Sequence, residues 1–415
     1  MNTITLQAQN NVTEIQGIQL TELVKEYGSP LYVYDAESIE NQYKKLIGSF
    51  HDTNIRIKYA TKALSNISVL KYMKKIGIGL DVVSIEELKI GIKAGYEAKE
   101  IMYTPNCVDF QEIEEVITLG ATLNLDNIPF VEKFGKKYGG TIPLCIRINP
   151  HVEAGGNHKI KTGHIESKFG ISIDQLDQVY DLVDKYDIDM AGIHVHTGSD
   201  FGDIDVFLKV AEVMYGVAMN FKNLKFLDFG SGFKVAYKQG DKETNIEELG
   251  SKMSDSFAKF CQKYGKKLDL WFEPGKYLVS KSGYLLAKAT VIKQTPATTF
   301  IGLNTGLNHL IRPMMYESYH EIVNISNPDG NKKKYSVVGY ICETDTFAWE
   351  REMTETKEGD IIAFKNAGAY GFSMSSNYNS RIRPAEVMIH KGKAILIRKR
   401  ETLDDILKNQ IEVNF

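Results

Sequence analysis

Short apolar runs alternate with longer amphipathic stretches from about residue 55 to residue 275. The amphipathic stretches, such as Ile67 to Ile76 and Ile85 to Ala94, place apolar residues at helical spacing. Short apolar runs between helices are typical of buried parallel strands. The eight predicted strands are Ile55–Tyr59, Ile78–Val83, Ile101–Thr104, Thr122–Leu125, Pro143–Ile148, Met190–Val195, Leu224–Phe229 and Leu268–Phe272. Eight such repeats predict a (β/α)8 TIM barrel, with a doubly wound sheet as the alternative fold.

Beyond about residue 283 the pattern changes to β-branched and alternating stretches, which predict an antiparallel β domain. The predicted strands of this domain are Tyr284–Ile292, Lys334–Val338, Asp360–Phe364, Ala385–Ile389 and Lys393–Arg398. We therefore divide the chain into an N-terminal segment, 1–35, that contributes to the β domain, a barrel, 36–282, and the C-terminal β domain, 283–415.

Charge and cysteine content exclude several classes of protein. The 415 residues carry 50 Lys and Arg against 53 Asp and Glu, so no basic field favours nucleic acid or an anionic membrane. Residues 1–19 contain no basic-then-apolar signal, and no apolar run approaches about 18 residues, so we expect a cytoplasmic protein. The four cysteines lie far apart without metal-type spacing, and we expect neither a disulfide nor a bound metal.

Polar residues follow most of the predicted barrel strands. In a TIM barrel these strand ends share one face, where the active site is assembled. Lys62 follows the first strand, next to Ala60 and Ala63. A partly desolvated amine at this position has a lowered pKa and can form a Schiff base with an aldehyde cofactor, whereas the alternative is an ordinary solvated lysine.

Eight segments in order carry a resemblance to a known family. They are Tyr59-Ala-Thr-Lys62-Ala, Leu80-Asp-Val-Val-Ser84, Ser167-Lys-Phe-Gly170, His194-Val-His196-Thr-Gly-Ser199, Glu273-Pro-Gly-Lys276, Ile311-Arg-Pro-Met-Met-Tyr316, Cys342-Glu343 and Ala367 to Ser380. Over about residues 28 to 400 the chain resembles the diaminopimelate decarboxylases, pyridoxal-phosphate enzymes with an alanine-racemase-like barrel. Each segment alone is weak evidence, but the ordered set is specific.

The resemblance implies that pyridoxal 5'-phosphate is held by Lys62. Glu273 would keep the pyridine nitrogen protonated, because a nearby carboxylate raises the pKa of a base. His196 would stack on the ring and Ser199 would donate to the phosphate, whereas we expect His194 to be a hydrogen-bonded core residue one layer deeper. The full set of predicted cofactor-binding residues is Lys62, Asp81, His196, Ser199, Gly230, Ser231, Gly232, Glu273, Gly275, Lys276 and Tyr370.

The resemblance also assigns residues to the substrate. Cys342 would protonate the carbanion, so the predicted catalytic residues are Lys62 and Cys342. The Cys342-Glu343 segment would reach the barrel of a second subunit, which implies a homodimer with shared active sites. The predicted substrate-binding residues are Lys276, Arg312, Tyr316, Glu343 and Tyr370.

The implied reaction is decarboxylation of the amino acid meso-2,6-diaminopimelate to L-lysine, the last step of lysine biosynthesis. A related decarboxylase for ornithine, arginine or carboxynorspermidine is the alternative, and Asp345 keeps it open because a cationic substrate calls for an acidic pocket. A non-catalytic relative and a racemase agree less well with the presence of Lys62 and Cys342. The chain departs from the family pattern at Leu64, Ser231, Lys276 and Thr344-Asp345-Thr346.

Lys276 replaces the family's arginine and offers a point charge without the bidentate fork. We also expect the stretch Gly155 to Gly163 to lie near the substrate.

Overall fold

The computed structural model describes residues 13–152, 163–200 and 202–415. All of the stretch Gly155 to Gly163 except its last residue lies outside them. Residues 39–279 form one compact unit, the barrel unit; the described residues up to Ser38 join residues 280–415 in a second, the β unit. Within the part of the chain that the structure describes, no helix is long and apolar enough to cross a membrane.

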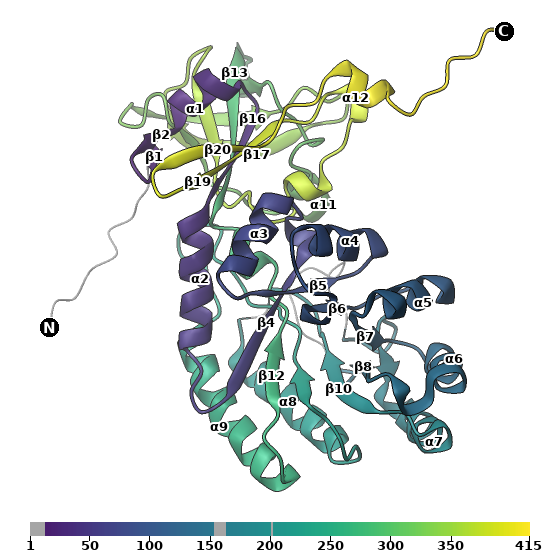
Figure 1. Ribbon diagram of the computed structural model, residues 1–415. Helices are drawn as coiled ribbons and strands as arrows, with labels where there is room; N and C mark the ends of the chain where they lie inside the picture. Colours follow the sequence, from purple (N-terminus) through teal and green to yellow (C-terminus); the bar gives the residue numbers. More distant parts are fainter. Residues whose placement is uncertain (1–12, 153–162, 201) are drawn as a thin grey trace, which may run out of the picture. The chain divides into compact units, whose positions relative to one another are not determined.

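Eight parallel strands close a barrel in the first unit, as the sequence predicts (Figure 1). Strand β12 pairs with β4 and strand β10 pairs with β8, so the sheet has no open edge between them. A short strand, β9 (Ile171–Ser172), pairs with the outer part of β8 and was not predicted. The barrel strands are β4 (Asn54–Ala60), β5 (Gly79–Val82), β6 (Ile101–Tyr103), β7 (Thr122–Leu125), β8 (Leu144–Asn149), β10 (Met190–Val195), β11 (Phe226–Asp228) and β12 (Asp269–Phe272). The predicted (β/α)8 barrel is therefore confirmed.

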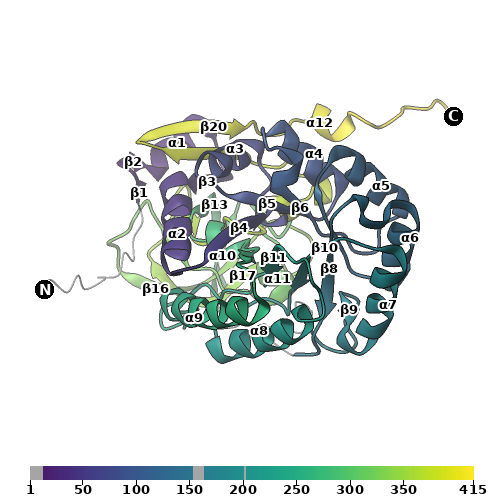
Figure 2. The same cartoon turned by 60° about the horizontal axis from the view of Figure 1, so that its bottom comes forward.

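Helices surround these strands (Figure 2). They are α3 (Ile67–Lys75), α4 (Ile85–Lys93), α5 (Phe110–Leu119), α6 (Ile128–Tyr138), α7 (Leu176–Tyr186), α8 (Ile204–Ala218) and α9 (Ile246–Tyr264), with α2 (Ala36–Gly48) leading into the barrel. Two of the polar residues that follow strands begin helices: the Ser84 side chain accepts from the amide of Glu87, and the Asn127 side chain from that of Phe130. Part of the polar strand-end pattern is therefore helix capping.

The barrel interior is filled in layers. Its lower layer is mainly apolar and contains Met102, Cys145, Ala191, Phe226 and Trp271, and the rings of Phe226 and Trp271 are stacked with centroids 3.7 Å apart. Side chains alternate along a strand, so residues two positions later face the same interior one layer higher. In this second layer, which we call the polar layer, Arg147, Asp228 and Glu273 lie two positions after Cys145, Phe226 and Trp271, and we include with them the buried Asp81 and His194.

The β unit is built on a mixed sheet of order β17-β16-β14-β13-β3-β19-β20, with β18 and β15 branching from β13. The predicted antiparallel arrangement is wrong at two places, because β14 pairs parallel with β16 and β3 pairs parallel with β19. Neither pair is joined by a tight turn that would impose opposite directions; the whole barrel separates β3 from β19. The strands are β3 (Leu31–Asp35), β13 (Gly283–Gln294), β14 (Thr299–Leu303), β15 (Ile322–Asn324), β16 (Lys332–Val338), β17 (Thr346–Thr354), β18 (Ile361–Phe364), β19 (Ala385–His390) and β20 (Lys393–Arg398).

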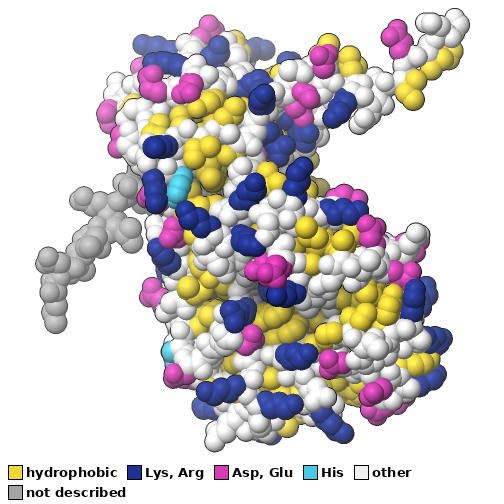
Figure 3. All heavy atoms as spheres, in the orientation of Figure 1, with side chains coloured by type: hydrophobic (Ala, Val, Ile, Leu, Met, Phe, Trp, Pro, Cys, Tyr) yellow, Lys and Arg dark blue, Asp and Glu magenta, His cyan; other side chains and the backbone are white. Residues whose placement is uncertain are grey.

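Charged side chains of both signs are interspersed over each unit on the face shown in Figure 3. Leu31, Val33, Leu286 and Val387 belong to the core of the β unit. The N-terminal strand β3 therefore supplies residues to that core.

Candidate active site

Lys62 lies in the 3-10 turn η1 (Thr61–Ala63), directly after β4. Its side chain is exposed, whereas Tyr59, Ala60 and Ala63 are buried. Its apolar neighbours therefore do not bury the Lys62 side chain in this chain, and its role in forming a Schiff base stays a prediction. Its positive charge still acts on Glu273, whose pKa it lowers against the larger effect of burial.

Glu273 directly follows β12, lies in the polar layer and is 8% exposed. Its Oε2 atom lies 3.0 Å from Nε2 of His194, which is 1% exposed. Burial and the charges of Arg147 and Lys62 lower the pKa of His194, so the imidazole is neutral and its Nε2–H donates to the carboxylate. The prediction of a packed, hydrogen-bonded core histidine is confirmed.

The loop Gly230-Ser231-Gly232 follows β11 and contacts His196. The Ser231 amide donates to Nδ1 of His196 at 3.3 Å, which leaves the proton of the neutral ring on Nε2. Gly230 has φ +57°, and a Cβ there would lie 2.7 Å from both His196 Nδ1 and the Val195 carbonyl oxygen. Gly232 has φ 129°, so both glycines adopt backbone conformations that disfavour a side chain.

The segment Glu273 to Lys276 passes close to the Lys62 turn. A Cβ at Gly275 would lie 3.2 Å from Cβ of Ala63, and the Ala60 amide donates to the Pro274 carbonyl at 3.4 Å. Lys276 is buried and forms an ion pair with Asp200, which follows the half-buried Ser199. The charge of Lys276 therefore already has a protein partner. Sequence reasoning did not identify Asp200.

Asp81 lies on β5 and is 3% exposed. Burial, and then the charge of Glu273, raise the pKa of Asp81, while the charge of Lys62 lowers it. The barrel unit thus contains ten of the predicted cofactor-binding residues: Lys62, Asp81, His196, Ser199, Gly230, Ser231, Gly232, Glu273, Gly275 and Lys276.

Three predicted substrate-binding residues lie together in the β unit. Arg312, at the start of α11 (Arg312–Tyr316), is 7% exposed, and its Nη2 donates to Ser318 Oγ at 3.2 Å. Its guanidinium carbon lies 5.9 Å from the ring centroid of Tyr316 and 5.8 Å from that of Tyr370. Tyr370 has φ 56°, an uncommon conformation for a bulky residue and one that recurs at functional sites.

Cys342 and Glu343 form a second exposed group in the β unit. The amide of Asn379 donates to Cys342 Sγ at 3.1 Å, and the Tyr378 hydroxyl donates to Glu343 Oε1. The segment that follows Tyr370 therefore holds the predicted proton donor and its neighbour. The predicted site residues are therefore divided between the barrel unit and the β unit.

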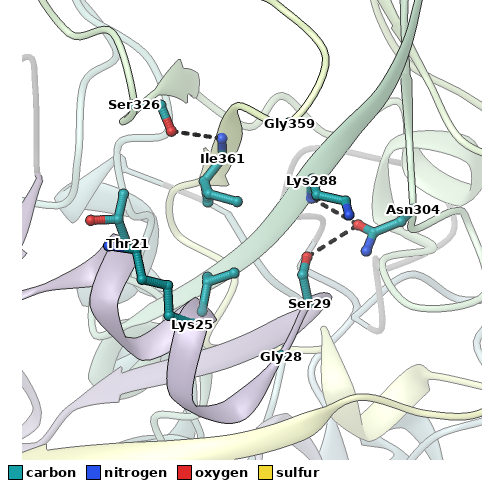
Figure 4. Close-up of a pocket in the computed structure, with 10 residues that line it drawn as sticks. Thr21, Lys25, Gly28, Ser29, Lys288, Asn304, Ser326, Gly359 and Ile361 are labelled. Carbon is teal, nitrogen blue, oxygen red and sulfur yellow. Dashed lines mark hydrogen bonds between the residues drawn. The ribbon is translucent and has the colours of Figure 1, made fainter.

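A cavity of about 450 Å³ also lies in the β unit (Figure 4). Lys25, Ser29, Lys288 and Asn304 are among the residues that line it, and Asn304 Oδ1 accepts from the Ser29 hydroxyl and the Lys288 amide. The lining includes none of the predicted site residues.

Sequence reasoning missed the roles of Asp228 and Lys58. Both are buried, and each lies on a strand at a position of inward parity. The Lys58 ammonium lies 4.5 Å from the Trp271 ring centroid and donates to the Glu100 carbonyl at 2.7 Å. The period of two along β4 and β11 is the signal that could have placed both side chains inside the barrel.

The barrel residues fit pyridoxal phosphate on two observations. The glycine loop provides backbone without Cβ atoms at a place where a side chain would collide with His196, which suits the close approach of a phosphate. Glu273 is a buried carboxylate whose oxygens have acceptor capacity beyond the bond from His194, which suits a protonated ring nitrogen.

Comparisons with known proteins agree with this geometry. Residues 36–280 match the family model described as pyridoxal-dependent decarboxylase, pyridoxal binding domain. The diaminopimelate decarboxylase of Methanothermobacter thermautotrophicus is 35% identical over 406 residues, which cover 95% of each chain.

Solved structures give the same result. The diaminopimelate decarboxylase of Helicobacter pylori complexed with L-lysine has a TM-score of 0.84 and 30% identity over 94% of this chain and 98% of its own. The lysine/ornithine decarboxylase of Vibrio vulnificus complexed with putrescine covers 90% of this chain and 97% of its own, with a TM-score of 0.78 and 19% identity, which shows the fold alone. The identity over nearly the whole chain and the pyridoxal-binding match together show that this chain belongs to the diaminopimelate decarboxylase family of pyridoxal-dependent decarboxylases.

Proposed function

We propose that this chain is a pyridoxal-phosphate-dependent carboxy-lyase that converts meso-2,6-diaminopimelate to L-lysine and carbon dioxide. Relatives at 35% and 32% identity over nearly the whole chain are diaminopimelate decarboxylases, and a related structure contains L-lysine, the product of this reaction. The observation that carries the choice of substrate is the buried side chain of Arg312, whose guanidinium lies near the rings of Tyr316 and Tyr370. A cationic fork is suited to the distal carboxylate that distinguishes diaminopimelate from lysine and ornithine.

In this proposal the barrel residues hold and orient the cofactor. Lys62 would bind its aldehyde carbon, and Ser199 and the glycine loop would bind its phosphate. His196 would contact its ring, and Glu273 would keep its nitrogen protonated. When bound, the cofactor supplies an electron sink for the pair of electrons that decarboxylation leaves behind. Asp81 and Lys276 would complete the electrostatic surroundings, with Lys276 acting as a point charge paired with Asp200.

Cys342 would then deliver the proton. The bond between Cα and the carboxylate breaks, carbon dioxide leaves, and the Sγ–H proton passes to Cα, which leaves a thiolate that takes a proton from water. A thiol suits this task because its ordinary pKa, about 8.5, is close to the working pH. Glu343 would contact the substrate beside it.

Asp345 does not support the alternative of a cationic substrate. It is 4% exposed, and its two carboxylate oxygens accept from the amides of Leu307, at 2.8 Å, and Ile341, at 3.0 Å. Burial raises its pKa to about 6. Its carboxylate therefore braces the backbone, where we do not expect it to bind the amine or guanidine of ornithine, arginine or carboxynorspermidine.

Carbon dioxide release from the purified protein with pyridoxal phosphate tests the proposal. Meso-diaminopimelate, L-ornithine, L-arginine, carboxynorspermidine and L-lysine are supplied in parallel. We expect release from diaminopimelate alone, with lysine as the product. Lys62→Ala should abolish it, and Lys71→Ala, at an exposed position on α3, should not. Release from a cationic amino acid would establish the alternative decarboxylase, and no release from any substrate would favour a non-catalytic relative.

We also propose a homodimer in which Cys342 and Glu343 of one subunit complete the barrel site of the partner. The support is the family resemblance of this segment and its exposure within its own unit. Mixing Lys62→Ala with Cys342→Ala should restore activity, because a mixed dimer would regain one site with both residues intact. If the mixture stays inactive while subunits exchange, each chain builds its own site. The cytoplasmic location expected from the sequence stays a prediction.

A further inference from the structure

Asp228 is a buried carboxyl group to which the family resemblance assigns no role. It ends β11 two residues after Phe226, and Glu273 lies two residues after Trp271, directly beyond the end of the neighbouring strand β12. Because Phe226 and Trp271 stack inside the barrel, the two carboxyl side chains lie side by side one layer higher. One nitrogen or oxygen atom from each of His194, Asp228 and Glu273 lies within 4.8 Å of the other two.

Hydrogen bonds link Asp228 to Gly230 and, through Gly230, to Glu273. The Oδ1 atom of Asp228 accepts from the amide of Gly230 at 2.9 Å. Gly230 is the first residue of the glycine loop Gly230-Ser231-Gly232, which we call the phosphate loop from here on. The Gly230 carbonyl accepts in turn from the Glu273 amide at 2.5 Å. Asp228 and Glu273 therefore hold the same glycine from its two sides.

One oxygen of each carboxyl group is left over. Among the described residues, Asp228 Oδ2 and Glu273 Oε1 are buried without a hydrogen-bond donor. Two adjacent buried carboxylates cannot both ionise without a large cost, since their negative charges repel each other away from water. A proton shared between these two oxygens would satisfy both of them. Glu273 Oε1 would keep a second acceptor site for the cofactor.

The surrounding charges decide which residue keeps the proton. Burial and the charge of Glu273 raise the pKa of Asp228. Lys62 and Arg147 lower the pKa of Glu273, which also accepts from His194. Glu273 is thus the residue that these cations stabilise as a carboxylate. Asp81 adds a further negative charge that opposes ionisation of Asp228.

We propose that Asp228 is a positioning residue that stays protonated, donates through Oδ2 to Glu273, and ties Glu273 to the phosphate loop through Gly230. This inference rests on the proposed function only in taking Glu273 and the loop as the groups that bind the cofactor. It makes one requirement: position 228 needs a donor and an acceptor but no negative charge. An asparagine can meet that requirement, because its amide offers one of each.

The test compares Asp228→Asn, Asp228→Leu and the control Asp181→Asn, an exposed aspartate on α7. Each apoprotein is titrated with pyridoxal phosphate by fluorescence, which needs no substrate. We expect the dissociation constant of Asp228→Asn to stay within about threefold of wild type. Asp228→Leu loses the hydrogen bond to the charged Glu273, so its dissociation constant for pyridoxal phosphate should rise about tenfold or more.

Infrared difference spectra of the apoproteins at neutral pH give an independent readout. Wild type minus Asp228→Asn should contain the carbonyl band of a protonated carboxyl group, and wild type minus Asp181→Asn should not. A carboxylate band instead, or binding by Asp228→Asn as weak as by Asp228→Leu, would overturn the proposal. If Asp228→Leu fails to fold, cofactor binding by Asp228→Asn and its infrared difference spectrum still test the proposal. Neither readout involves diaminopimelate, so failure of the proposed substrate would leave these outcomes unchanged.

Discussion

Replacing Gly230 by alanine tests whether the backbone of the phosphate loop is held in the one conformation that the site requires. Gly230 has φ +57°, and left-handed backbone costs a residue with a side chain about 1–2 kcal/mol. The added Cβ would lie 2.7 Å from the Val195 carbonyl oxygen, a backbone atom that cannot rotate away. Overpacking of this kind costs about 1–3 kcal/mol, so the total is about 2–5 kcal/mol.

Two measurements follow from this magnitude. The apoprotein should unfold at least about 4 °C below wild type, since each kcal/mol lowers the melting temperature of a domain of this size by about 2–4 °C. If the loop instead shifts to relieve the collision, the strain appears as weaker cofactor binding. A loss of about 2 kcal/mol raises the dissociation constant for pyridoxal phosphate about 30-fold.

Gly216 provides the matched control. It lies within α8, and an added Cβ there would have no heavy atom within 4 Å. The same change to alanine should therefore stabilise the protein by about 0.5–1 kcal/mol, through the lower entropy of the unfolded chain. If Gly230→Ala matched Gly216→Ala in both unfolding and cofactor binding, the argument from φ and close approach would be refuted.

Three further predictions concern single side chains. Burial lowers the pKa of Lys58 from 10.5 to about 8, so between pH 8 and pH 10.5 the unfolded state binds more protons than the folded state. The free energy of unfolding of wild type should therefore rise with pH over that range, and that of Lys58→Met should not. Denaturant unfolding at several pH values measures both. Cys342→Ala should lower kcat by about 100- to 10,000-fold in the carbon dioxide assay, whereas Cys261→Ala, a half-buried thiol on α9, should keep it; equal values would contradict proton donation by Cys342. Arg312→Lys retains the charge but loses the fork, so KM for diaminopimelate should rise about tenfold with a smaller change in kcat, and an unchanged KM would remove Arg312 from the substrate site.

The barrel strands could be predicted from the sequence because each is a compact apolar run with turn residues beside it. The β unit was predicted less completely. Strand β17 was missed because Glu350, Arg351 and Glu352 interrupt its apolar pattern, and β14 because it is short and contains Gly302. The parallel pairing of β3 with β19 depends on contacts between residues more than 350 positions apart, which no local pattern contains.

The site was predictable where its residues belong to recognisable segments. Glu273, His196 and the phosphate loop lie in the same barrel unit, and Arg312 lies beside Tyr370. Asp228 has no such segment, because its role depends on strand parity and on what lies beside it after folding. The exposure of Lys62 was also out of reach, since it depends on where the turn leaves the barrel.

The charge balance of the polar layer explains why these residues occur together. Asp81, Asp228 and Glu273 are three buried carboxyl groups of this layer, and two buried cations act on Glu273, Arg147 from the same layer and Lys58 from the layer below. A layer with more acidic than basic groups favours one added positive charge. The proton on Asp228 would supply it. The excess of carboxyl groups therefore accounts for a neutral Asp228, and it leaves Glu273 as the carboxylate that would face the ring nitrogen of the proposed cofactor.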